Sequence, residues 1–99
     1  MTKLGQYVFS DRKNALLQQE RGIGFEEIIR YIDSDALLEV IDHPNQATYP
    51  TQKFYVIAID GYAWMVPHKR DGENVILITA YKSRSTTKRL GLKGAIYEN

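Results

Sequence analysis

The spacing of hydrophobic residues in the first third of the chain is typical of helices. In residues 25–32 the apolar positions recur at i, i+3, i+4 and i+7, which places them on one face of a helix. These positions are Phe25, Ile28, Ile29 and Ile32. Residues 14–20 are also good helix formers, and Ser10 or Asp11 offers an N-cap before them. With the mixed apolar and aromatic residues 4–9 in front, the pattern predicts a short strand followed by two helices.

From residue 53 onward, β-branched and aromatic residues predict strands. The segment 53–59 is one strand, and Asp60-Gly61 is a strong signal for a two-residue hairpin turn. Residues 62–66 return as a second strand, which we expect to stop or fray at Pro67 because proline lacks the N–H that a sheet ladder uses. Residues 75–81 form the last strand, expected to be central because four aliphatic residues run together.

Three further segments connect or extend these elements. Residues 36–41 fit either a strand or a third helix, and the β-branched residues that close the segment favour a strand. Residues 42–51 contain two prolines and few apolar residues, and predict a long loop. Ser83 or Ser85 can cap a short basic helix that ends near Gly91.

Helices and strands are kept apart along the chain, which favours an α+β domain with an antiparallel sheet. We expect two N-terminal helices packed on one face of a sheet of about four strands, with a short basic helix at the C-terminal end. The opposite face of the sheet is expected to be open to solvent or to a ligand. A chain of 99 residues predicts one domain, spanning residues 1–99.

Charge is distributed unevenly along the chain, although the formal net charge is only +1. Residues 1–50 hold five Lys/Arg against eight Asp/Glu, which gives −3, and residues 51–99 hold eight against four, which gives +4. This split suggests that the second half faces nucleic acid and that the first half has another task. The absence of cysteine fits a reducing cytoplasm, and no apolar run in the sequence is long enough to span a membrane.

Basic residues are concentrated after the last predicted strand. They are Lys82, Arg84, Lys88, Arg89 and Lys93. No Asp or Glu interrupts them, and serine and threonine hydroxyls lie between them. Cations and hydroxyls together are the usual donors to phosphate oxygens, so we expect these residues to converge on a shared anion-accepting hollow beside the sheet. The alternative is a solvated tail whose cations keep the protein soluble.

Aromatic residues of the meander offer a second kind of contact with RNA. They are Tyr55, Tyr62, Trp64 and Tyr81. On an open sheet face such rings can stack on unpaired bases. The alternative is packing in the core or on the sheet face, which is the better interpretation for any single ring.

Two histidines are candidate acid–base groups, His43 in the predicted loop and His68 after the hairpin return. Two histidines and a lysine are the minimum set for cleaving RNA. A base takes the proton of the 2′-hydroxyl, a cation stabilises the charged phosphorus centre, and an acid protonates the leaving oxygen. The alternative for His43, which precedes a proline, is a turn residue. We expect no metal site and no cofactor, because metal-binding histidine spacings and glycine-rich phosphate loops do not occur in the sequence.

Five segments, in their order and spacing, resemble one family of proteins. They read FSDRKN at residues 9–14, ERGIGFEE at 20–27, DHPN at 42–45, KFYVIAI at 53–59 and ITAYKSR at 78–84. The chain resembles the BrnT-type toxins of bacterial toxin–antitoxin pairs, which are small ribonucleases of the RelE-like group. The resemblance extends over residues 7–90 and therefore covers most of the domain.

The resemblance implies a RelE-like α+β fold and messenger-RNA cleavage without a metal. It also implies a cognate DNA-binding antitoxin that neutralises the toxin, represses their shared operon and forms a hetero-tetramer with it. The positions that match the family's basic sites are Lys53, Lys82 and Arg84. His68 lies where such a toxin can place an acid–base group, and Tyr81 could exchange protons if the nearby cations lower its pKa.

The sequence therefore predicts a cytoplasmic ribonuclease toxin. Its predicted catalytic residues are His68, Lys53, Tyr81, Lys82 and Arg84. Its predicted RNA-binding residues are Lys88, Arg89, Trp64 and Tyr55. Two alternatives stay open: a non-catalytic nucleic-acid-binding module that uses the same basic cluster, and a protein-interaction domain whose acidic helices meet a partner.

Overall fold

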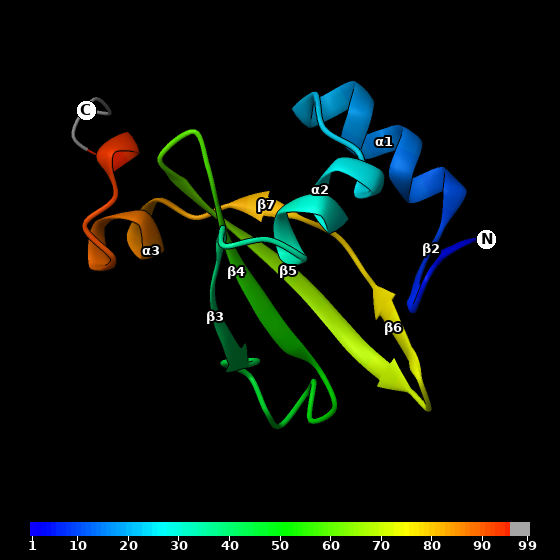
Figure 1. Ribbon diagram of the computed structural model, residues 1–99. Coiled ribbons are helices and arrows are strands. Elements are labelled where there is room, and N and C mark those ends of the chain that lie inside the picture. The colour runs from blue at the N-terminus through cyan, green and yellow to red at the C-terminus, as the bar shows by residue number, and fades with distance from the viewer. Residues whose placement is uncertain (96–99) are drawn as a thin grey trace.

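In the computed structural model, which describes residues 1–95, seven strands form one sheet (Figure 1). Six strands lie in the order β1-β2-β6-β5-β4-β3, and β7 pairs with β5. The strands are β1 (Thr2–Leu4), β2 (Tyr7–Phe9), β3 (Leu37–Asp42), β4 (Lys53–Ile59), β5 (Tyr62–Asp71), β6 (Asn74–Leu77) and β7 (Tyr81–Lys82). Among the described pairs, β2 and β6 run parallel and the others are antiparallel. The α+β class is confirmed, but the sheet is larger than the predicted four strands.

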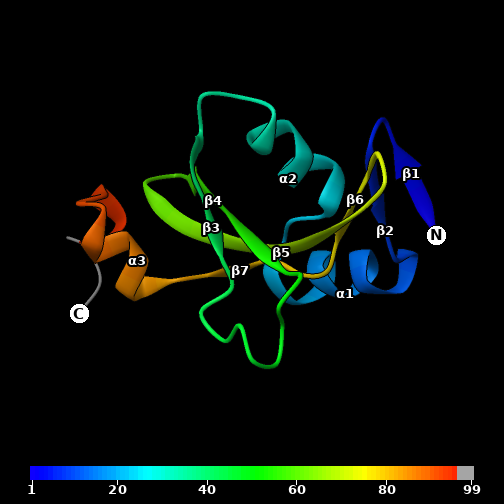
Figure 2. The ribbon, with the colours of Figure 1, turned by 90° about the horizontal axis from the view of Figure 1, so that it is seen from below.

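The helices lie on both sides of this sheet. They are α1 (Asp11–Arg21), α2 (Phe25–Ile32), α3 (Arg84–Arg89) and the 3-10 helix η1 (Lys93–Ala95). α2 packs against β4, and α1 beside it adds one buried side chain, Leu17, to the same core. Figure 2 shows α3 at the end of the molecule far from β1 and β2. Within the described residues, no helix is long and apolar enough to cross a membrane.

Local signals at the helix ends set the boundaries of α1 and α2. The Ser10 hydroxyl accepts a hydrogen bond from the Lys13 N–H at 3.2 Å, so Ser10 is the N-cap of α1. Gly22 ends α1 in the left-handed region, at a φ of 72°. The first N–H of α2, on Phe25, donates to Oδ1 of Asn14 at 2.7 Å. A side chain of α1 therefore satisfies the first N–H of α2 and links the two helices.

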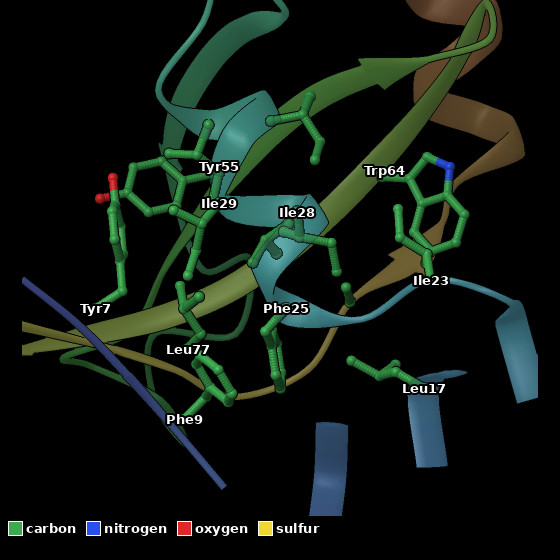
Figure 3. Close-up of a cluster of buried hydrophobic side chains, with 14 of the residues drawn as sticks. Tyr7, Phe9, Leu17, Ile23, Phe25, Ile28, Ile29, Tyr55, Trp64 and Leu77 are labelled. Carbon is green, nitrogen blue, oxygen red and sulfur yellow. The ribbon is translucent and has the colours of Figure 1, made fainter. Parts of the chain in front are cut away.

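Two hydrophobic cores lie on the two faces of the sheet because the residues of β4 and β5 alternate between them. The larger core packs α2, with Leu17 of α1, against the sheet (Figure 3). It draws Tyr55, Ile57 and Ile59 from β4. The smaller core takes the alternate residues Phe54 and Val56 and includes Leu90 and Leu92 near α3. The predicted open face of the sheet is thus partly covered, because the chain after β7 folds back across it.

β5 does not stop at Pro67 but continues to Asp71, which corrects the prediction. The Pro67 carbonyl accepts a hydrogen bond from the Ile78 N–H at 2.9 Å, so the backbone of this position faces the β6–β7 side. Here β5 changes partner: Met65 is paired with β7, whereas His68 is paired with β6. The N–H that Pro67 lacks is at the point where β5 changes partner, so no hydrogen bond of the ladder is lost. The strand therefore continues past Pro67.

Two other predicted strands are divided in the structure. Residues 4–9 belong to a hairpin, in which Gly5 takes a φ of 59° between β1 and β2. The last predicted strand, 75–81, is interrupted at residues 78–80, which lie outside any strand between β6 and β7. β6 lies between β2 and β5 and is therefore internal to the sheet. Residues 37–41 of this segment take the favoured strand form as part of β3.

Candidate functional site

A hollow lies on the α2 face of the sheet, over one end of β4 and β5. α2 has eight residues and is about 12 Å long, whereas the ten residues of β5 extend about 33 Å, so the helix covers only part of the strand. We call this space of about 360 Å³ the basic hollow. It is lined by Val40, Thr51, Lys53, Tyr55, His68, Lys69 and Arg70. It lies where the covering helix layer ends and the sheet continues.

Strand register brings three of the predicted site residues together in this hollow. Lys53 of β4 is directly opposite His68 of β5. Tyr55 is two residues beyond Lys53, and Arg70 is two residues beyond His68, so the period of two places all four on the same face. The hollow therefore combines a histidine, two cations and a phenol from two adjacent strands.

The imidazole of His68 is held rigidly. Its side chain is 3% exposed, and its ring stacks on the Tyr55 ring with 3.7 Å between centroids and 10° between planes. Nδ1 lies 3.1 Å from the Val66 carbonyl oxygen. A carbonyl can only accept a hydrogen bond, so Nδ1 carries the proton and the lone pair of neutral His68 is on Nε2. This tautomer has one basic nitrogen left for a ligand.

The surroundings keep His68 neutral near physiological pH. Burial lowers the pKa of His68 below its ordinary value, and the positive charges of Arg70 and Lys53 lower it further. The hydrogen bond to the Val66 carbonyl acts in the opposite direction but does not outweigh them. Burial also raises the pKa of the Tyr55 phenol. The hollow thus holds a neutral imidazole that can accept a proton and a phenol that keeps its own.

Two buried tyrosines close the core at the end next to the basic hollow (Figure 3). The Tyr7 hydroxyl donates a hydrogen bond to Oδ1 of Asp33 at 2.6 Å. Burial and then this bond raise the pKa of Tyr7 to about 12. The hydroxyl ends of Tyr7 and Tyr55 point toward one another, so Tyr7 supports the ring on which His68 stacks.

The lining of the basic hollow is positively charged. It includes Lys53, Lys69 and Arg70, and none of its lining residues is acidic. Lys53 has one acidic neighbour outside the lining, since its Nζ lies 3.7 Å from Oδ1 of Asp42. Both side chains of this pair are mostly exposed, so water screens the attraction and leaves the Lys53 charge available. An anion such as a phosphate group suits this site.

Lys82 and Trp64 lie in a different hollow on the same face of the sheet. Lys82 is directly opposite Trp64 in the pairing of β7 with β5. Its Nζ lies 5.4 Å from the centroid of the Tyr62 ring and 5.8 Å from that of the Trp64 ring, within cation–π range. This second hollow of about 300 Å³ contains Arg21 but also two carboxylates, of Glu27 and Asp60. It is of mixed charge, unlike the basic hollow.

Tyr81 lies on the other face of the sheet. Its ring meets the Phe54 ring edge-on, with 6.5 Å between centroids, in the core near α3. Burial raises the pKa of Tyr81, which is opposite to the shift that a role in proton exchange at neutral pH would need. The structure therefore separates Tyr81 from His68 and Lys53.

The prediction that the cations after the last strand share one hollow is wrong. Lys82 is on the α2 face, whereas Arg89 of α3 forms a two-point ion pair with Glu39 of β3 at 2.5 and 3.3 Å. Glu39 is opposite Val56, a residue of the core near α3. Arg84 begins α3, and Lys88 is exposed one turn later. Lys82 and Arg89 lie on opposite faces because β7 and α3 carry the chain from one face of the sheet to the other.

Arg70 and Lys69 were not among the predicted site residues. The signal that could have found them is the alternation of His68 and Arg70, which puts both on the face of Lys53 once β5 continues beyond Pro67. Among the described residues, no three His, Asp or Glu side chains gather as a metal site. No protein-family model, no curated protein and no solved structure matches this chain.

Proposed function

We infer that the chain is a ribonuclease that cuts RNA at the basic hollow without a metal, and that it is the toxin of a type II toxin–antitoxin pair. One observation carries the ribonuclease part: a neutral, buried His68 lies directly opposite Lys53, with Arg70 next on the same face. The resemblance of five sequence segments to BrnT-type toxins supports the toxin part. It also supports a RelE-like form of the observed α+β fold.

The proposed reaction is attack of a ribose 2′-hydroxyl on the adjacent phosphate. Nε2 of His68 accepts the hydroxyl proton as the O2′–P bond forms, and the P–O5′ bond breaks. The products are a 2′,3′-cyclic phosphate and a free 5′-hydroxyl. The leaving 5′ oxygen takes a proton from the Lys53 ammonium group, so atoms and charges balance.

The other residues of the hollow have supporting roles in this scheme. Arg70 holds the phosphate, because a guanidinium binds two oxygens at once and does not give up its proton. Arg70 and Lys53 together stabilise the negative charge that grows on the phosphate oxygens in the transition state. Tyr55 fixes the plane of the His68 ring through the observed stacking.

Further basic and aromatic residues extend the proposed RNA contact away from the hollow. They are Trp64, Lys82, Arg84, Lys88 and Arg89. In this proposal the four cations bind phosphates rather than take part in bond breaking, and Trp64 supports Lys82 through the cation–π contact. The cognate DNA-binding antitoxin, in a hetero-tetramer with the toxin, remains part of the proposal on the resemblance alone.

A non-catalytic RNA-binding module is the second candidate. The observation that favours it is the burial of His68, whose side chain is only 3% exposed. A base with so little exposed surface needs a small opening of the hollow before a 2′-hydroxyl can reach it. This candidate uses the same cations, so its affinity for RNA would fall steeply with salt, and no cleavage would occur.

Cleavage of RNA in the presence of EDTA tests the proposal. The wild-type chain should release fragments that end in a cyclic phosphate. Replacing Lys53 and Arg70 together with alanine should slow cleavage by about 100-fold or more, because both cations stabilise the transition state. The matched control replaces Lys3 and Arg12, exposed residues of β1 and α1, and removes the same charge. Equal cleavage by the wild type and the Lys53/Arg70 variant would contradict the assigned site.

The pH dependence of cleavage should show the lowered pKa of His68. A general base must be unprotonated, so kcat/KM is retained at neutral pH and lost as the pH falls through the pKa of His68. Burial and two cations lower that pKa, so the acidic limb should lie below the ordinary histidine value of about 6.5. A kcat/KM profile with a matched set of buffers measures the limb. A limb above the ordinary value would rule out this assignment.

A further inference from the structure

β3 is the last strand at one margin of the sheet. It pairs with β4 on one side, and no other described strand pairs with it (Figure 1). With six residues, β3 is twice as long as β1 at the opposite margin. The backbone groups of an edge strand that point away from the sheet can accept another strand.

The register of β3 identifies which backbone groups point outward. The His43 N–H donates to the Gln52 carbonyl at 3.1 Å, which makes His43 and Gln52 a hydrogen-bonded pair next to β3. In an antiparallel ladder such pairs alternate with pairs that are not hydrogen-bonded to each other. Asp42 and Val40 fall in the second kind, opposite Lys53 and Tyr55. Their N–H and C=O groups therefore face the open side of β3.

Along this edge the exposed apolar side chains of Leu38 and Val40 alternate with two acidic ones, Glu39 and Asp42, which pair with Arg89 and Lys53. Val40 is 52% exposed, and Leu38, which lies in a β-bulge of the ladder, is 41% exposed. Val40 also lines the basic hollow. The open edge of β3 and the basic hollow are therefore one continuous surface, with Val40 at its margin and cations in its interior.

We propose that the edge of β3 takes up an extended segment of a partner protein, and that an acidic side chain of this segment enters the basic hollow. Addition of a strand to an open edge satisfies the outward groups of Val40 and Asp42 and gives the segment its direction. A residue of the added strand beside Val40 lies next to the rim of the hollow. From there a glutamate or aspartate approaches Lys53, the cation of the hollow that lies on β4, the strand next to β3.

The charge of the hollow favours an acidic partner over a second copy of this chain. Two copies joined edge to edge through β3 would bring two basic hollows to either side of the same Val40 contact. No acidic residue lines the hollow, and the nearby Asp42 offsets only one of its three cations, Lys53, so the remaining cations of the two copies would repel each other. An acidic segment, in contrast, neutralises the cations as it binds. The inference goes beyond the proposed function, since it holds or fails whether or not the hollow cuts RNA.

A synthetic peptide tests the inference without RNA. The probe is a capped peptide of alternating valine and glutamate residues, about as long as β3. Titration followed by NMR hydrogen exchange should show new protection at the amides of Val40 and Asp42. Replacing glutamate with glutamine in the peptide should weaken binding about tenfold at low salt, because the attraction to Lys53 is lost. Absence of protection at these two amides, or equal binding of the glutamine peptide, would overturn the inference.

Two matched changes separate strand addition from simple charge attraction. Methylation of the peptide N–H groups on one edge of its strand should abolish binding, whereas methylation on the other edge should not. In the protein, Val40→Pro removes one outward N–H, and Val40→Thr keeps it with nearly the same shape. Only the proline variant should lose binding. Equal binding of both methylated peptides would overturn strand addition. A dimer of the free chain that Val40→Pro dissociates would also overturn the inference, because the edge of β3 would then bind a second copy of this chain.

Discussion

Replacing His68 with phenylalanine is expected to lower the rate of RNA cleavage by about 10²–10⁴-fold, the usual contribution of a positioned general base. Phenylalanine keeps an aromatic ring to stack on Tyr55 and is only slightly larger than histidine, but it has no nitrogen to accept the 2′-hydroxyl proton. Lys53 and Arg70 remain in place, so affinity for RNA and its dependence on salt should change little. A fragment-release assay together with filter binding measures the two quantities separately.

The second histidine provides the matched control. His43 lies in the loop after β3, its ring is 4.5 Å from the Tyr49 ring and 4.8 Å from the Phe54 ring, and its Nδ1 accepts a hydrogen bond from the Asn45 N–H. These contacts fit the structural interpretation of His43 as a turn residue. His43→Phe should therefore cleave RNA at the wild-type rate. Loss of cleavage in His43→Phe with normal cleavage in His68→Phe would move the active site to the loop.

Much of the local structure follows from short-range signals in the sequence. The i, i+3, i+4, i+7 pattern of α2, the Ser10 cap and the hairpin at Asp60-Gly61 all depend on neighbours within a few residues. The parallel pairing of β2 with β6 joins segments more than sixty residues apart, and no local pattern specifies it. Its energetic basis is the packing of the core that both strands share.

Half of the candidate site could have been derived from the turn alone. A two-residue turn at Asp60-Gly61 fixes the register of the hairpin, and each step back along β4 matches one step forward along β5. Followed to its end, this register places Lys53 opposite His68. The expectation that the strand stops at Pro67 hid this pairing. That expectation rested on the N–H that proline lacks. Because β5 changes its pairing partner at Pro67, the missing N–H breaks no hydrogen bond of the ladder, and the strand can continue.

The basic cluster near the C-terminal end shows what charge along a sequence does not specify. Lys82 and Arg89 are seven residues apart, yet one packs over aromatic rings on the α2 face and the other pairs with Glu39 on the opposite face. The face of the sheet on which each cation lies depends on where β7 leaves the sheet and on the direction of α3. The density of charge along the sequence therefore does not specify which cations share a hollow, whereas strand register does.

Phe25→Ala is expected to destabilise the domain by about 3–5 kcal/mol, as truncation of a buried aromatic ring usually does. Phe25 is 0% exposed, and its ring lies 5.0 Å from that of Phe9 at the centre of the larger core (Figure 3). Truncation leaves a cavity between α2 and the sheet at the first residue of the helix, where Asn14 of α1 is also bonded. Urea unfolding followed by circular dichroism measures the loss of free energy of unfolding.

The loss should be a large part of the stability of a domain of this size, which is about 5–15 kcal/mol. Leu16→Ala is the matched control, because Leu16 lies on α1 and is 37% exposed, so its truncation opens no comparable cavity. The basic hollow is built on β4 and β5, whose larger core α2 covers, so Phe25→Ala should also loosen the stack of His68 on Tyr55. A Phe25→Ala variant as stable as Leu16→Ala would mean that α2 does not anchor the core on which the site is built.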